Sequence, residues 1–152
     1  MKKGTILYHE SFEFKNGEIG EKLLVLLNTP KPSVEPHLLC KATSQQDGKP
    51  QIPGCHPSLS LFFISAGQDF FVKDTWLQLY DIYPVDTASV LQDSFNKQLI
   101  IKGILSDKTI IDLMSCIGKI KDIEIEYKRL ILEKNELIDK LLEGGRFRAK
   151  KR

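Results

Sequence analysis

Cysteine is scarce in this sequence, and no apolar run in it is long. The three cysteines, Cys40, Cys55 and Cys116, are odd in number and widely spaced, which is not the pattern of a disulfide framework. No segment approaches the roughly 20 apolar residues that a helix needs to cross a bilayer. The opening residues 1–3 are not followed by the apolar run of a signal peptide. These absences predict a soluble cytoplasmic protein that does not contact a membrane.

A strong overall charge is also missing, but the charge is unevenly distributed along the chain. The 22 basic and 20 acidic residues give a formal net charge of +2. Five of the basic residues lie together at the end of the chain, which leaves 17 basic against 20 acidic residues before it. These five are Arg146, Arg148, Lys150, Lys151 and Arg152. A basic tail on a mildly acidic body suits contact with phosphate or with an acidic surface, and a solvated chain end is the alternative.

An unbroken apolar run, Leu23 to Leu27, lies at the centre of the predicted fold. Gly20 precedes it and Asn28-Thr29-Pro30 follows it, a pattern typical of a short strand buried on both faces. Such a strand needs a neighbour on each side. Further strands are predicted near residues 4–14, 37–43, 58–65, 74–83 and 97–105. Closely spaced short strands of this kind predict a mainly β protein, with a small antiparallel barrel over residues 1–106.

A long helix is predicted after the barrel, over residues 107–143. Ser106 suits an N-cap, apolar residues recur at helical spacing as far as Leu141, and Gly144 begins a stop signal. A helix of this length extends roughly 55 Å, more than a small barrel can cover. We therefore expect its second half to pair with a second copy, as in a coiled coil, or with a partner. The alternative is a helix that breaks near residues 118–122 and folds back on the domain.

Two possible reactive centres involve cysteine and histidine. His37, Cys40, Cys55 and His56 have the side chains of zinc ligands, but the adjacent Cys55 and His56 rarely reach one tetrahedral ion together. We therefore expect no metal and no other cofactor. Cys55 beside His56 is also a minor candidate for a cysteine nucleophile and its base. Sequence adjacency does not supply the hydrogen-bond geometry that such a pair needs.

A third candidate centre combines Lys22 with Thr43 and Ser44. Each of these groups lies at the end of a predicted strand, so the pairing of the two strands would place all three beside one cleft. Lys22 would supply a positive charge for a phosphate, and the hydroxyls would supply hydrogen bonds. Together they suit the charge that develops when a phosphodiester is attacked by its own 2′-hydroxyl. A lysine at a strand end is also common in domains that have no such site.

The order of these segments resembles that of PemK/MazF-type toxins over roughly residues 3–118. The segments KKGTILY and GEKLLVLLN are similar to the family's first strand and its G-x-R-P-V-L-V-L-S strand. LLCKATSQ is similar to the strand that ends in P-x-T-S, and DTWLQLYDIYPVD to the D-Q-I-R-x-x-D segment. KGILSDKTIIDLMSCI is similar to the family's terminal helix.

The resemblance implies an SH3-like barrel that forms a homodimer, cleaves single-stranded RNA without a metal and is neutralised by an antitoxin protein. Lys22 stands at the position of the family's catalytic arginine, and Thr43 or Ser44 at that of its threonine or serine. The sequence departs from the family in four respects. Lysine lacks the planar fork of arginine, Leu23 replaces the proline that normally follows, the loop after Thr43 is long, and the last helix is longer.

Two functions are therefore expected from the sequence. The first is a toxin-like endoribonuclease in which Lys22, Thr43 and Ser44 are catalytic and His56 carries protons. Contacts with RNA are then expected from Lys41, Gln45, Lys49, Arg146, Arg148, Lys150, Lys151 and Arg152. The second is a non-catalytic module that recruits a protein or a nucleic acid through the long helix and the basic tail.

Overall fold

The computed structural model describes residues 1–133. The second half of the predicted helix and the basic tail, residues 134–152, lie outside the described residues. The elements follow in the order β1 (Thr5–Glu13), β2 (Ile19–Leu26), β3 (His37–Thr43), β4 (Gly54–His56), β5 (Leu61–Ile64), β6 (Thr75–Val85), α1 (Thr87–Phe95), β7 (Leu99–Ile104), α2 (Asp107–Lys119) and α3 (Ile125–Leu132). A short 3₁₀ turn, Pro57–Leu59, stands between β4 and β5.

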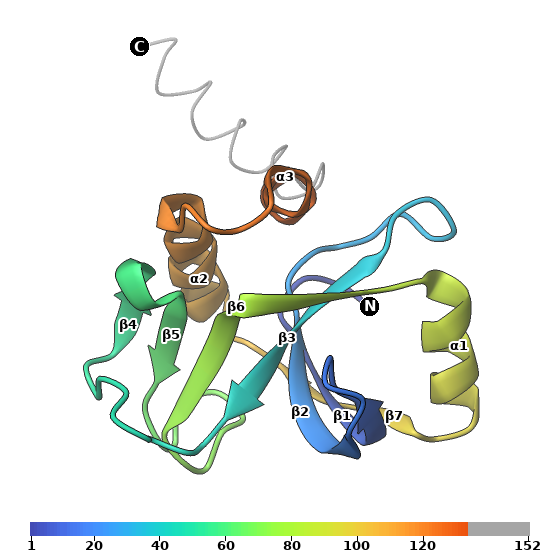
Figure 1. The fold of residues 1–152 in the computed structure, drawn as a ribbon, viewed down its shortest axis with the longest axis horizontal. Helices are drawn as coiled ribbons and strands as arrows, with labels where there is room; N and C mark the ends of the chain where they lie inside the picture. Colours follow the sequence, from blue (N-terminus) through green and yellow to red (C-terminus); the bar gives the residue numbers. More distant parts are fainter. Residues whose placement is uncertain (134–152) are drawn as a thin grey trace, which may run out of the picture.

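The seven strands form one antiparallel sheet in the order β4-β5-β6-β3-β2-β1-β7 (Figure 1). Together with the three α-helices found among residues 1–133, this sheet makes a mixed α/β protein. The prediction of a closed barrel is wrong, because no pairing within residues 1–133 joins β4 to β7. Each of the two edge strands is connected to helix α2 instead. β4 spans only three residues and is tied to α2 by a disulfide, and β7 leads directly towards α2.

The position of β2 confirms the central strand predicted from the apolar run. β2 pairs with β1 on one side and β3 on the other, and its residues Leu24, Val25 and Leu26 are completely buried. Val25 belongs to the larger apolar cluster, whereas Leu24 and Leu26 belong to a second one. Because side chains alternate along a strand, this division shows that both faces of β2 are covered.

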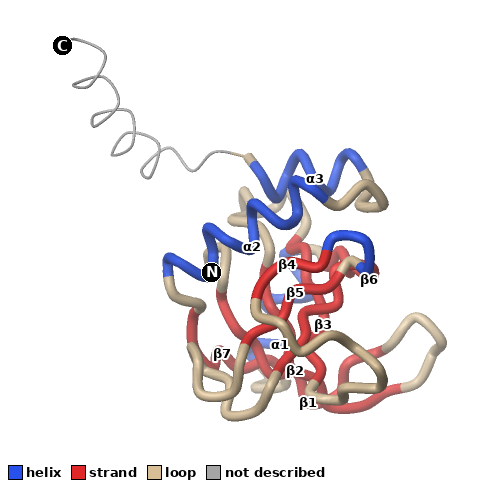
Figure 2. The backbone as a smooth tube through the Cα atoms, turned by 90° about the vertical axis from the view of Figure 1, so that its left-hand side faces the viewer, coloured by secondary structure: helices blue, strands red, loops and turns tan. Residues whose placement is uncertain are grey.

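The helix after β7 is not one long helix. α2 ends at Lys119, the chain is extended at Ile120, and α3 begins at Ile125. The alternative prediction, a break near residues 118–122 that folds the chain back, is correct for the described residues. Figure 2 shows α2 and α3 together on one side of the sheet.

Burial of apolar side chains explains the break. Ile120 and Ile123 lie in the connection between the helices, and both are buried in the larger cluster with Leu130 and Ile131 of α3. A straight helix over residues 107–132 would extend about 39 Å, whereas the break folds Leu130 and Ile131 back onto the core that α2 covers. The ammonium of Lys128 donates hydrogen bonds to the carbonyls of Ile120 (2.7 Å) and Gly118 (3.3 Å), and it thereby caps the last turn of α2.

The N-terminus of α2 is capped as predicted. The Ser106 hydroxyl oxygen accepts a hydrogen bond from the Thr109 N–H at 3.3 Å. Asp69 adds a cap that the sequence did not suggest. Its carboxylate accepts from the Ser106 N–H at 2.6 Å and from the Thr109 hydroxyl at 2.8 Å. The segment before β6 is thus fastened to the start of α2.

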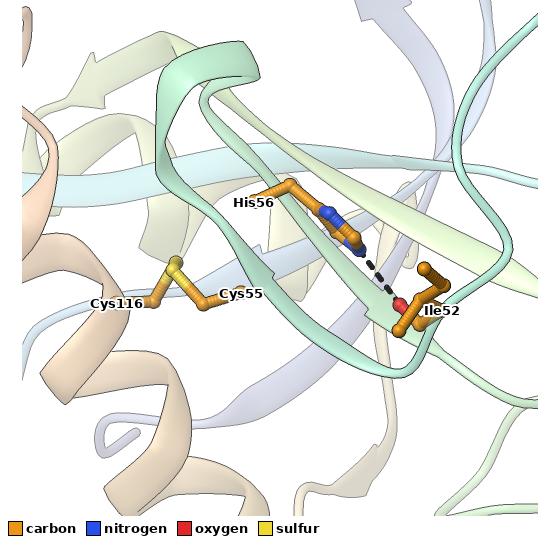
Figure 3. Close-up of a disulfide and its surroundings, with 4 residues drawn as sticks. All are labelled: Ile52, Cys55, His56 and Cys116. Atoms are coloured by element: carbon orange, nitrogen blue, oxygen red, sulfur yellow. Dashed lines mark hydrogen bonds between the residues drawn. A yellow bond between two sulfur atoms is a disulfide. The ribbon is translucent and has the colours of Figure 1, made fainter.

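Cys55 of β4 and Cys116 of α2 form a disulfide, with Cα atoms 5.3 Å apart (Figure 3). The expectation that the cysteines form no disulfide is therefore wrong. The two residues are 61 positions apart, so only the fold that brings β4 beside α2 reveals the pair. Cys40 is buried as a free thiol, and its burial raises its pKa to about 12. None of the helices described is both long enough and apolar enough to cross a membrane.

Candidate functional site

One cleft lies where the β2–β3 ladder ends. Lys22 is not at the end of its strand as predicted, because β2 begins at Ile19 and Lys22 pairs with His9 of β1. The strands pair with Leu23 opposite Ala42, so Lys22 and Thr43 adjoin this last pair at the end of the ladder. Both residues line a cleft of about 510 Å³, together with Ser44 and Gln45. The strand pairing that the sequence suggested is therefore present, and it brings the predicted lysine, hydroxyls and amide together.

Lys22 is the cation of this cleft that is most withdrawn from water. Its side chain is half-buried, and burial is the main cause that lowers its pKa. The positive charges of Lys41 and Lys49 lower it further. Within residues 1–133, no carboxylate lies within salt-bridge distance of the Lys22 ammonium. A partly desolvated ammonium without a counter-ion favours the binding of an anion.

The loop after β3 places further polar groups near Lys22. The Thr43 hydroxyl oxygen accepts a hydrogen bond from the Gln45 N–H at 3.2 Å, which turns the chain out of the strand. The Lys49 ammonium donates to the carbonyls of Gln45 (3.1 Å) and Gln46 (3.4 Å). Lys49 thus orders the start of the loop while it adds positive charge to the surroundings of Lys22.

Tyr8 and Glu21 also line the cleft, and Glu21 was not among the site residues expected from the sequence. The Tyr8 hydroxyl donates a hydrogen bond to Glu21 Oε2, and this bond is the main cause that raises the pKa of Tyr8. Tyr8 lies opposite Leu23 in the β1–β2 register, so its proximity to Lys22 depends on a strand pairing. Glu21 directly precedes Lys22, and that adjacency was the available signal.

Segment 70–73 contributes an aromatic ring and a second lysine to the cleft. Phe71 is buried in the larger apolar cluster, whereas Phe70 is 40% exposed. A Cβ atom on Gly103 of β7 would lie 3.7 Å from the Cβ of Phe70, so the ring rests over a residue without a side chain. Lys73 lines the same cleft. An exposed ring between lysines suits the stacking of a base.

Lys41, a predicted RNA contact, is not among the residues that line the cleft. Its ammonium lies 3.1 Å from Asp81 and 5.6 Å from the ring centres of Phe14 and Tyr83. Burial opposes the charge on Asp81, but hydrogen bonds from Lys15, Lys41 and Tyr83 outweigh it, and the pKa of Asp81 lies below its usual value. Lys41 is therefore paired with Asp81, and its effect on the cleft is limited to the electrostatic lowering of the Lys22 pKa.

His56 is not brought to the cleft either. Its ring Nε2 is hydrogen-bonded to the Ile52 carbonyl at 2.7 Å, on the β4 side of the sheet (Figure 3). The neighbouring Cys55 has no free thiol, so the hypothesis of a Cys55 nucleophile is wrong for this disulfide-bonded state. In the part of the chain that the structure describes, no three His, Cys, Asp or Glu side chains are grouped as ligands for one metal ion.

A histidine–carboxylate pair that the sequence did not indicate lies elsewhere on the sheet. His9 Nε2 is 3.0 Å from Asp93 Oδ2, and His9 Nδ1 is 3.0 Å from the Ser11 nitrogen. A backbone N–H can only donate, so Nδ1 accepts and Nε2 carries the proton. Both ring nitrogens are thus occupied, and the pair holds the irregular part of β1 against α1 rather than offering a free base.

The candidate site is thus defined by the groups that line the cleft. The cleft combines a half-buried lysine, hydroxyls, a tyrosine–glutamate pair and an exposed ring. Comparison of the chain with protein-family models, curated proteins and solved structures finds no match.

Proposed function

We propose that this protein is an endoribonuclease that binds single-stranded RNA in the cleft beside Lys22 and cleaves it without a metal ion. The observation that carries the proposal is Lys22 itself. It is half-buried, has no salt-bridge partner among residues 1–133 and lies beside Thr43 and Ser44. A phosphodiester would supply the negative charge that pairs with this lysine. The hydroxyls of Thr43 and Ser44 can donate hydrogen bonds to the non-bridging oxygens of the phosphate.

Binding of RNA in this cleft uses charge and stacking together. Lys22 and Lys73 contact the phosphates, and the exposed ring of Phe70 stacks on one base. The Gln45 side chain adds hydrogen bonds to a base edge. A base can leave the stack of its neighbours readily only in a single strand. The proposed substrate is therefore single-stranded RNA.

The chemical step is the attack of a 2′-hydroxyl on the neighbouring phosphorus. Glu21 takes the proton of the 2′-hydroxyl, a P–O bond to the 2′-oxygen forms, and the bond to the 5′-oxygen breaks. Lys22, whose pKa is lowered by burial, gives a proton to the leaving 5′-oxygen. Thr43 and Ser44 donate hydrogen bonds to the charged oxygens of phosphorus. The products are a 2′,3′-cyclic phosphate and a 5′-hydroxyl.

The resemblance to PemK/MazF-type toxins supports this proposal. On this basis we also propose that the sheet is related to SH3-like folds and that the protein forms a homodimer. It would then act in a toxin–antitoxin system, in which an antitoxin protein neutralises it. The basic tail, residues 146–152, adds phosphate contacts. His56 has no part in this step, because it faces the Ile52 carbonyl and does not line the cleft.

Cleavage of a labelled single-stranded RNA by the purified full chain tests the proposal. The reaction is run in excess metal chelator, and wild type is compared with Glu21→Gln and with Lys121→Ala, an exposed lysine outside the cleft. We expect cleavage in chelator, its loss in Glu21→Gln and full activity in the control. RNA that stays intact with the wild type, or equal cleavage by Glu21→Gln, would contradict the proposed reaction.

A second function, a non-catalytic RNA-binding module, is favoured by two observations. Lysine stands where the family has arginine, and no histidine among residues 1–133 lines the cleft. A single ammonium holds a phosphate less rigidly than a guanidinium fork does. Fluorescence anisotropy separates the two functions, because a binding module retains RNA affinity that depends on Lys22 and leaves the strand intact.

A further inference from the structure

The Cys55–Cys116 disulfide fastens the least supported strand of the sheet. β4 has three residues, pairs only with β5 among the described strands, and forms one edge of the sheet. Cys55 is half-buried, whereas Cys116 is completely buried in α2. The disulfide (Figure 3) is therefore the covalent link between an edge strand and the helical layer, and Cys55 is the less buried of its two residues.

Segment 44–53 connects this strand with the candidate cleft. It begins with Ser44 and Gln45, which line the cleft, and ends where β4 begins. The Trp76 indole N–H donates to the Pro50 carbonyl at 2.8 Å, and His56 is bonded to the Ile52 carbonyl. These hydrogen bonds and the disulfide together fix the far end of a loop whose near end forms the cleft wall.

We propose that Cys55–Cys116 is a thiol–disulfide exchange site that controls the order of segment 44–56 and, through it, the cleft. Disulfides that a thiolate can reach from solvent are the labile, regulatory ones, and Cys55 is only partly buried. The oxidised form holds β4 on α2, and reduction releases it. The effect on RNA rests on the proposed function, whereas the effect on the segment does not.

Reduction proceeds through two exchange steps with a dithiol. A thiolate of the reductant attacks Cys55 Sγ, the half-buried sulfur, and forms a mixed disulfide, while Cys116 leaves as a thiolate that takes up a proton. The second thiolate of the reductant then attacks the mixed disulfide and displaces Cys55. Two electrons pass from the dithiol to the protein, and the dithiol closes to its own disulfide.

Release of the disulfide leaves β4 with its three pairs to β5 and the two loop hydrogen bonds. Edge strands with so few backbone pairs open at low free energy. Opening moves the loop that carries Gln45 and Lys49, so the positive charge beside Lys22 is no longer held in place. Reduction therefore weakens the cleft without unfolding the central strands.

Hydrogen–deuterium exchange of the full chain tests the local effect. Oxidised protein is compared with protein reduced by dithiothreitol, and the double variant Cys55→Ser/Cys116→Ser serves as a permanently open form. We expect amides of residues 44–56 to exchange at least about tenfold faster after reduction, while β2 amides are unchanged. Cys40→Ala, which leaves the disulfide intact, must respond to reductant as wild type does. Equal exchange in the oxidised and reduced protein would overturn the proposal.

RNA cleavage measured on the same samples tests the coupling to the cleft. We expect a loss of about fivefold or more on reduction, in line with the cost of misplacing groups around a site. The double variant must show the reduced level with or without reductant. Faster exchange without any change in cleavage or RNA affinity would overturn control of the cleft. Absence of cleavage in every state would contradict the ribonuclease, while the exchange data would still decide the disulfide's role.

Discussion

Leu23 of β2 pairs with Ala42 of β3, and this single register brings Lys22 and Thr43 together at the end of the β2–β3 ladder. A shift of one residue would turn every side chain of β2 to the opposite face. Leu24, Val25 and Leu26 are completely buried, so such a shift is strongly disfavoured. The apolar run that builds the core therefore also positions the cleft.

Phe70→Ala tests the aromatic wall of the cleft. The ring is 40% exposed and lines the cleft beside Lys73, so its removal loses a stacking surface and little of the core. We expect single-stranded RNA affinity to fall by about 1–3 kcal/mol, measured by fluorescence anisotropy. Phe95→Ala, an exposed phenylalanine of α1, is the matched control. Equal affinity of both variants would exclude stacking on Phe70.

Reduction of the disulfide is expected to lower the free energy of unfolding. The bond closes a loop of 61 residues, which corresponds to about 4 kcal/mol in the chain-entropy account. Urea unfolding of wild type with and without dithiothreitol measures this difference. The Cys40→Ala variant, run alongside, should lose a similar amount on reduction. A change below about 1 kcal/mol would show that the link constrains little of the unfolded chain.

Acid is expected to destabilise the protein through His37. This residue is buried, its Nδ1 has no hydrogen-bond partner among the described residues, and burial lowers its pKa from 6.5. The unfolded chain therefore binds a proton at a higher pH than the folded chain does. The contribution of neutral His37 to the free energy of unfolding is fully present above pH 6.5. It is lost as the pH falls from 6.5 through the lower pKa of the folded state.

Urea unfolding at a series of pH values measures this loss. His37→Phe removes the titrating group at the same buried position, and the variant should lose less stability between pH 7 and pH 5. His56→Gln, a change at the hydrogen-bonded histidine of β4, is the control. A wild-type profile that is flat over this range would exclude His37 as its source.

Lys128→Met tests the connection between α2 and α3. The ammonium donates to the carbonyls of Gly118 and Ile120, and methionine keeps the apolar stem while it removes both donors. We expect a loss of about 1–2 kcal/mol in the free energy of unfolding, measured in urea. Arg129→Met is the control, because its partner Glu126 is exposed and exposed pairs contribute little. Equal stability of the two variants would contradict the capping role.

The sequence revealed elements whose formation is local. β3 has the predicted bounds, and the capping of α2 by Ser106 follows from the adjacent residues. The break after Lys119 was not decided by sequence, because Ile120 and Ile123 continue the helical spacing and only the core determines where they are buried. The open sheet was likewise undetermined, since a strand pattern does not name its neighbour.

The candidate site divides in the same way. Lys22 and Thr43 were recognisable because each adjoins a readable apolar run, although Lys22 lies inside β2 and not before it. Glu21 and Phe70 were missed. Only the adjacency of Glu21 to Lys22 pointed to the first, and the place of Phe70 depends on Gly103 beneath the ring. The Cys55–Cys116 pair joins elements 61 positions apart, and spacing alone carries no information about such a contact.

The most direct test of the account is the rate at which Lys22 variants cleave a labelled single-stranded RNA under single-turnover conditions. Lys22→Met removes the charge and keeps most of the side-chain volume, and we expect the rate to fall by about 100-fold or more. Lys22→Arg restores the positive charge but not a group that gives up its proton, so it should recover only part of the rate. A Lys22→Met variant that is folded and cleaves RNA at the wild-type rate would contradict the role of this cleft.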